Sequence, residues 1–65
     1  MKQVDEMPTN GQFVAVWELQ GSKITSETLM WDSCGHLLVL MDDGYHEEVD
    51  ADFYVELEAK YFIPD

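Results

Sequence analysis

The sequence predicts a mainly β or α+β fold: a twisted antiparallel meander of four to five short strands, with one short helix near residues 52–58. Segments rich in β-branched and aromatic residues recur along the chain, and turn-forming residues separate them about every ten positions. Hydrophobic residues make up 46% of the sequence and aromatic residues 12%. Because that composition can form a packed core, we expect one folded domain over residues 1–65 rather than a disordered chain.

The N-terminal part of the chain predicts a tail, a turn and then a strand. Residues 1–8 begin with a polar stretch and end at Pro8, so we expect a flexible N-terminal segment. Asn10-Gly11 predicts a turn, and residues 12–19 predict the first strand. On that strand one face carries Phe13, Ala15, Trp17 and Leu19. Val14 and Val16 are on the other, which predicts a central strand covered on both sides.

Three further strands are expected before residue 50. They are predicted over residues 24–31, 36–41 and 45–49. Turn residues precede or separate them at 20–23, 32–35 and 42–44. The segment 45–49 is highly charged, and charged side chains discourage pairing with another chain, so it predicts an edge strand.

Residues 50–60 are compatible with two structures. Asp50 or Asp52 could cap a short helix, with acidic residues in its first turn. The same residues also alternate as a strand would, with Phe53 and Val55 on one face. We favour a helical turn near residues 52–55, followed by a strand near 57–63 that stops at Pro64.

The charge of the chain restricts its partners. Fourteen acidic residues stand against three lysines and no arginine, which gives a formal net charge of −11. Direct nucleic-acid binding is disfavoured because contacts to phosphates need Lys and Arg, and an anionic membrane surface would repel the chain. Since so much self-repulsion destabilises a small fold, we expect a strongly positive protein partner.

The acidic residues concentrate in one segment. Residues 42–52 hold six carboxylates and no lysine or arginine: Asp42, Asp43, Glu47, Glu48, Asp50 and Asp52. Alternate residues on one strand face are about 6.6 Å apart, close to the roughly 6–7 Å rise of two successive phosphates on one DNA strand. Glu48, Asp50 and Asp52 have this spacing, and Glu56 and Glu58 would form a second row.

Aromatic side chains beside these acids would supply anchoring area to an interface. Tyr45 and Tyr54 are the expected aromatic contacts. The alternative interpretation of the acidic segment is a solvated face that keeps the protein soluble.

Catalysis and cofactor binding are not expected. The single cysteine, Cys34, cannot form an internal disulfide, which favours a reducing cytoplasm. Cys34, His36 and His46 are zinc-ligand types, but neighbouring hairpin turns place them at opposite ends of a sheet. The four glycines are isolated and form no phosphate-binding loop. We therefore expect no enzyme, no metal and no cofactor. A leader or membrane-spanning segment is not expected either.

In size, charge and layout the whole chain resembles small acidic phage-type inhibitors of host defence, above all the DNA-mimicking anti-CRISPR proteins. Inhibitors of restriction enzymes and of uracil-DNA glycosylase resemble the chain in the same general features. The segments from Met7 to Trp31 and from Tyr61 to Pro64 are also similar to small β-proteins of phage genomes. The resemblance implies an inhibitor in the host bacterial cytoplasm that blocks DNA binding by a Cas effector.

A second class of function stays open. Val14, Val16, Leu38 and Leu40 could form an apolar patch if one sheet face has no cover. The protein would then be a small β structural or interaction module, either a homodimer or a binder of another protein.

Overall fold

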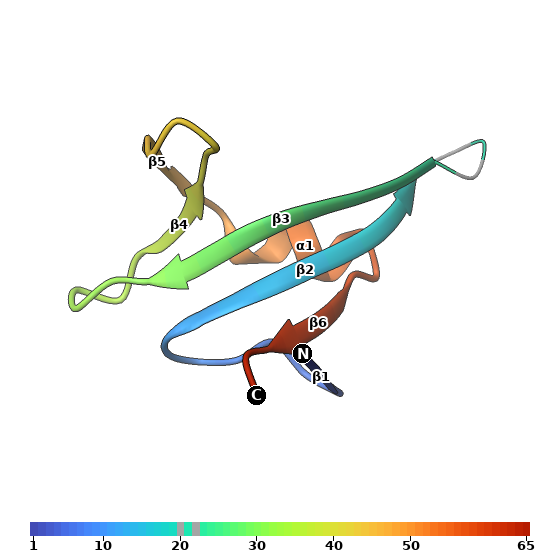
Figure 1. The fold of residues 1–65 in the computed structure, drawn as a ribbon, viewed down its shortest axis with the longest axis horizontal. Coiled ribbons are helices and arrows are strands. Elements are labelled where there is room, and N and C mark those ends of the chain that lie inside the picture. Colours follow the sequence, from blue (N-terminus) through green and yellow to red (C-terminus); the bar gives the residue numbers. More distant parts are fainter. Residues whose placement is uncertain (20, 22) are drawn as a thin grey trace.

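The computed structural model describes residues 1–19, 21 and 23–65 and has one six-stranded antiparallel sheet with one short helix (Figure 1). The elements in chain order are β1 (Lys2–Val4), β2 (Gln12–Leu19), β3 (Lys23–Trp31), β4 (Leu37–Leu40), β5 (His46–Val49), α1 (Ala51–Glu56) and β6 (Lys60–Ile63). In the sheet the strands have the order β1-β6-β2-β3-β4-β5. The predicted fold class is confirmed.

The predicted meander forms the sheet from its centre to one edge. Strands β2, β3, β4 and β5 pair consecutively, and β5 lies at an edge as predicted. The turn expected at residues 20–23 joins β2 to β3, whose register pairs Leu19 with Lys23; residues 20 and 22 are outside the described part of the chain. In the hairpin between β4 and β5, Gly44 has a positive φ of 88° and its N–H donates to the Met41 carbonyl at 3.0 Å.

The sheet extends beyond a meander because β6 returns to the other side of β2. Every neighbouring pair is antiparallel, so β6 runs in the same direction as β5, and α1 carries the chain between them behind the strands seen in Figure 1. The expectation of a flexible segment over residues 1–8 is wrong for residues 2–4. They form β1, which pairs with β6, and Val4 lies opposite Tyr61 and packs against the core.

Helix α1 resolves the ambiguity over residues 50–60. Asp50 is the N-cap, and its carboxylate accepts a hydrogen bond from the N–H of Asp52 at 2.9 Å. At the other end Glu58 has a left-handed φ of 56°. The N–H of Glu58 donates to the Val55 carbonyl and that of Ala59 to the Tyr54 carbonyl. This is the Schellman arrangement that ends many helices, with glutamate where glycine is usual.

The core lies between one face of the sheet and α1. Its buried members are Phe13, Ala15, Trp17, Leu29, Leu37, Val39, Tyr54 and Tyr61. The Tyr54 ring meets the Trp17 ring edge-on, with centroids 5.6 Å apart. Trp31 is half-buried, and its indole N–H donates to the Pro8 carbonyl at 2.7 Å. Strand β2 is central as predicted, but the expected cover on its second face is wrong. Val14 and Val16 are half-buried and are not among the residues packed against the core.

Candidate partner-binding surface

The six predicted acidic residues of segment 42–52 surround the edge strand β5. Asp42 and Asp43 lie in the β4–β5 hairpin, Glu47 and Glu48 in β5, and Asp50 and Asp52 at the start of α1; all six are exposed. Residues 32–52 are here called the acidic end. They contain these six residues and Asp32, which makes seven carboxylates, and no lysine or arginine.

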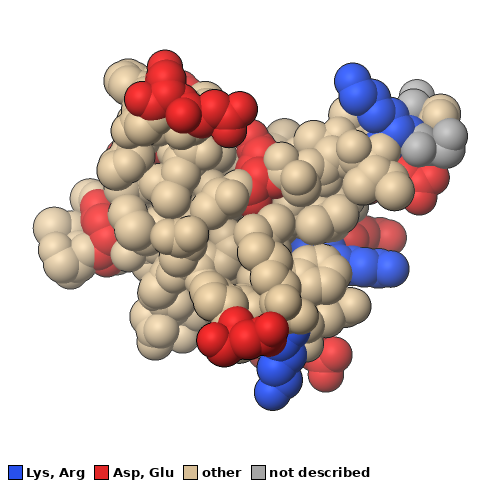
Figure 2. All heavy atoms as spheres, in the orientation of Figure 1, with Lys and Arg blue, Asp and Glu red and all other residues tan. Residues whose placement is uncertain are grey.

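The cationic residues lie elsewhere in the fold. Lys2 is in β1, Lys23 begins β3 and Lys60 begins β6. Figure 2 shows the same separation, since its blue side chains lie along the right and lower margins, away from the β4–β5 hairpin at the upper left of Figure 1. The negative charge of the acidic end is therefore not neutralised by neighbouring lysines.

The predicted row of evenly spaced carboxylates is wrong. Strand β5 ends at Val49, and Asp50 turns its carboxylate onto the Asp52 N–H to cap the helix. Glu48, Asp50 and Asp52 therefore do not share a strand face. Glu47 lies opposite Val39 and Glu48 opposite Leu38, so these neighbours point to opposite faces of the sheet.

The predicted second row is wrong as well. Glu56 is the last residue of α1, and Glu58 is the left-handed residue beyond it, so neither lies on a strand. Glu58 lines a hollow of about 320 Å³ together with Lys60, Trp17 and Ile24. This region contains a lysine and is distinct from the acidic end.

The two predicted aromatic contacts differ in exposure. Tyr45 is 64% exposed in the β4–β5 hairpin, where its N–H donates to the Asp43 carboxylate at 2.9 Å. It is therefore accessible to a partner. Tyr54 is only 1% exposed, and its hydroxyl donates to the Glu27 carboxylate at 2.9 Å. Its prediction as a partner contact is wrong because the helix turns it into the core. Burial, followed by the hydrogen bond to Glu27 and the charge of Glu27, raises the pKa of Tyr54.

A groove opens beside β5. It has a volume of about 570 Å³, and its lining includes Trp31, His36, Glu48 and Asp50. The sheet register aligns Trp31, Leu37 and Val49, and Glu48 and Asp50 flank Val49 along the chain. An aromatic side chain beside two carboxylates suits a Lys or Arg side chain, which has an apolar stem and a cationic head. No local sequence pattern indicates this groove, since its walls come from separate segments.

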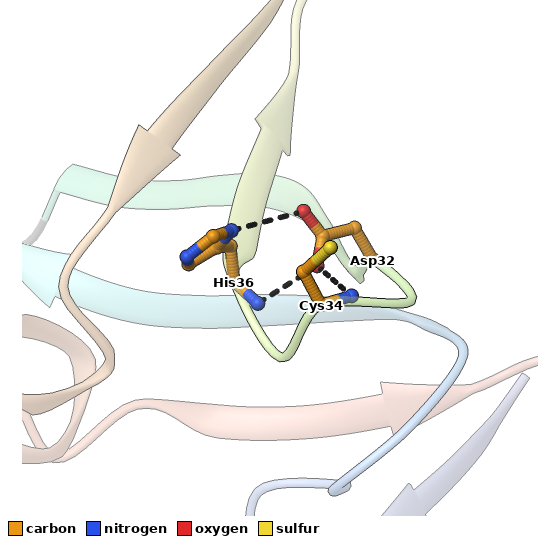
Figure 3. A network of polar contacts seen from close by, with 3 residues as sticks. All are labelled: Asp32, Cys34 and His36. Carbon is orange, nitrogen blue, oxygen red and sulfur yellow. Dashed lines mark hydrogen bonds and ion pairs between the residues drawn. The ribbon is translucent and has the colours of Figure 1, made fainter.

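The turn between β3 and β4 is held by Asp32 (Figure 3). One carboxylate oxygen accepts the N–H groups of Cys34 and His36, each at 2.8 Å, and the other lies 3.3 Å from the His36 Nδ1. The His36 N–H is the largest cause that lowers the pKa of Asp32, assisted by the Cys34 N–H and the imidazole, and together they outweigh desolvation. Among the residues that the structure describes, no three His, Cys, Asp or Glu side chains are grouped to hold a metal ion.

The sheet face away from α1 carries apolar side chains. Val14, Val16, Leu38 and Leu40, which the sequence predicts as a patch if one face is uncovered, are all half-buried there. They are absent from the set of side chains packed against the core, within the described residues. In Figure 2 much of the face turned to the viewer is free of charged side chains, and carboxylates lie mainly along its margins.

Comparisons with protein-family models, curated proteins and solved structures found no match to this chain. In the described part of the chain, no helix has the length and apolar character needed to cross a membrane.

Proposed function

We propose that the chain is a non-enzymatic inhibitor that binds a basic nucleic-acid-binding surface of a host defence complex, with a Cas effector as the favoured target. The observation that supports this proposal is the separation of charge. Seven carboxylates lie in residues 32–52 without a cation, whereas all three lysines lie in other elements. A surface of one sign attracts a partner of the other and accelerates encounter.

The proposed mode of binding is charge imitation without a regular row. Exposed carboxylates on both sides of β5 would meet the Lys and Arg side chains that normally hold phosphates. The groove beside β5 would accept one such side chain between Trp31 and the carboxylates of Glu48 and Asp50. Tyr45, exposed next to Asp43, would add apolar contact area.

The test compares two triple variants with the same change in net charge. Asp42, Glu47 and Glu48 are changed to Lys in one variant, and Asp5, Glu6 and Asp65 in the control; all six residues are exposed. Asp32, Asp43 and Asp50 are kept because their carboxylates hold turns or the helix. Binding to a purified Cas effector–guide RNA complex is measured at about 0.1 M and about 0.5 M salt.

The acidic-end variant should lose at least about tenfold in affinity, and the control variant should lose much less. Higher salt should weaken binding by the unchanged chain. Equal affinity of the two variants would remove the acidic end from the mechanism. If the unchanged chain does not bind, the Cas effector is not the target.

A second candidate function is supported by the uncovered sheet face. In this case the chain would be a structural or interaction module that forms a homodimer or binds another protein through Val14, Val16, Leu38 and Leu40. The acidic end would then only keep the protein soluble. Light scattering on the purified chain distinguishes the two functions, because an apolar homodimer persists at high salt.

A further inference from the structure

The sheet face opposite α1 carries apolar side chains from four strands, and these residues are here called the outer face. Its members are Val14, Val16, Ile24, Met30, Leu38, Leu40 and Phe62. Directly paired residues of an antiparallel sheet point to the same face. Phe62 pairs with Val14, and Met30 pairs with Leu38, so apolar pairs join β6 to β2 and β3 to β4. Between β2 and β3 the direct partner of Val14 is Thr28, and Val14 meets Met30 as a diagonal neighbour.

This composition is unusual for the solvent side of an antiparallel sheet, where polar residues normally alternate with buried ones. Ile24 is 72% exposed and the other members are half-buried. Within the part of the chain that the structure describes, these half-buried members do not pack against the core. Because they add little to the core, their apolar character points to contact with another molecule.

Two carboxylates and one lysine border the outer face, and the lysine is Lys60, which pairs with Val16. Glu48 lies opposite Leu38 on β5, and Glu18 lies opposite Ile24 at the far end of β2. At the β3–β4 margin there is a hollow of about 330 Å³, whose lining includes Leu40, Met41 and Asp42. An aliphatic wall next to a carboxylate matches the stem and the charged head of a Lys or Arg side chain.

The charges also argue against a second copy of this chain as the occupant. Each copy has a net charge of −11, so joining two copies would bring like net charges together. Like charges across an interface oppose association. A partner of opposite charge removes this conflict.

We propose that the outer face binds an apolar strip of a protein partner whose flanking side chains are Lys or Arg. This inference rests on the proposed function, because the partner is the basic protein already assigned to the acidic end. Glu48 connects the two surfaces, because it belongs to the acidic end and pairs with Leu38 of the outer face. The apolar contacts would supply most of the binding free energy, and the carboxylates would orient the partner.

Two synthetic peptides of equal charge serve as probes. One has about ten residues that alternate Lys and Val, so that it presents an apolar strip in extended form, and the other alternates Lys and Ser. The chain variants are Leu38→Thr with Leu40→Thr on the outer face, and Leu19→Thr as a control on the opposite face of β2. Threonine suits strands, and circular dichroism checks that each variant folds.

The unchanged chain and the Leu19→Thr control should bind the Lys-Val peptide about tenfold more tightly than the Lys-Ser peptide. The Leu38→Thr, Leu40→Thr variant should reduce this ratio to below about threefold. A ratio near one for the unchanged chain, or a ratio that the double variant leaves intact, would overturn the proposal. A dimer that the double variant converts to a monomer would assign the outer face to a second copy and also overturn it.

The acidic-end variant separates this inference from the proposed function. With Asp42, Glu47 and Glu48 changed to Lys, both peptides should bind more weakly while their ratio is kept. If neither affinity changes, the proposed function fails whatever the ratio. If both affinities fall but the unchanged chain showed no preference, only the role of the outer face fails.

Discussion

The Tyr54 hydroxyl donates a hydrogen bond of 2.9 Å to the Glu27 carboxylate and thereby joins α1 to β3. The Tyr54 ring also contacts the Trp17 ring on β2. A single side chain of the helix therefore contacts both long strands of the sheet. Its contribution to stability can be tested directly.

Changing Tyr54 to Phe should lower the free energy of unfolding by about 1 kcal/mol, because the ring still fills the core but the hydrogen bond is lost. Urea denaturation followed by tryptophan fluorescence measures the change. Tyr45→Phe is the matched control, since Tyr45 is exposed and its hydroxyl lies outside the core. Equal stability of the two variants would show that the bond to Glu27 contributes nothing net.

The stability of the protein should fall as the pH rises above about 10, the ordinary pKa of tyrosine. Burial and Glu27 raise the pKa of Tyr54 in the folded state, and burial raises that of Tyr61. The unfolded chain therefore loses these protons at a lower pH than the folded chain, and ionisation favours unfolding. Denaturation curves between about pH 8 and pH 11 should show this decline, with a smaller slope for Tyr54→Phe. The same slope in that variant would assign the decline to other groups.

At acid pH, Asp32 should contribute a separate loss of stability. The N–H groups of His36 and Cys34, together with the His36 imidazole, lower its pKa in the folded state. Its contribution is complete above the unfolded-state pKa of about 3.9 and disappears as the pH falls through the lower folded value. Asp32→Asn should make the stability less dependent on pH below about 4, as measured by thermal unfolding. Asp5→Asn is the control, and an identical response of the two variants would contradict the role of Asp32.

Changing Glu58 to Gly should stabilise the protein by about 0.5–1 kcal/mol, although it removes a side chain. Glu58 has a left-handed backbone, which costs about 1–2 kcal/mol for a residue with a Cβ, and the greater unfolded-state entropy of glycine offsets part of this gain. Glu58→Gln is the control, because it removes the charge and keeps the Cβ. Thermal denaturation should show a higher midpoint for glycine alone, and an equal increase for glutamine would attribute the effect to charge.

The features that could be predicted from the sequence are those encoded locally. The strand over residues 12–19 was predicted with its bounds, because β-branched and aromatic residues run without interruption between two turns. The edge position of β5 followed from its charged residues. The helix cap at Asp50 was one of two alternatives, since the residue type alone does not decide between Asp50 and Asp52.

The features that were missed depend on contacts between distant residues. Strand β1 is short and partly polar, and it exists because β6 returns beside it. The buried position of Tyr54 depends on where α1 lies against the sheet. The prediction of a carboxylate row is wrong because it assumes that the strand continues past Val49. The backbone leaves the strand there and starts the helix.

Strand β6 also protects the strand beside it. Its first three residues pair with Val14, Ala15 and Val16 and so cover one flank of β2, and they reach that position only after the chain has passed through α1. Without them, peptide N–H and C=O groups on that flank would be open to strands of other molecules, which is a common start of aggregation. Resistance to self-association during folding thus depends on how soon the residues after the helix dock.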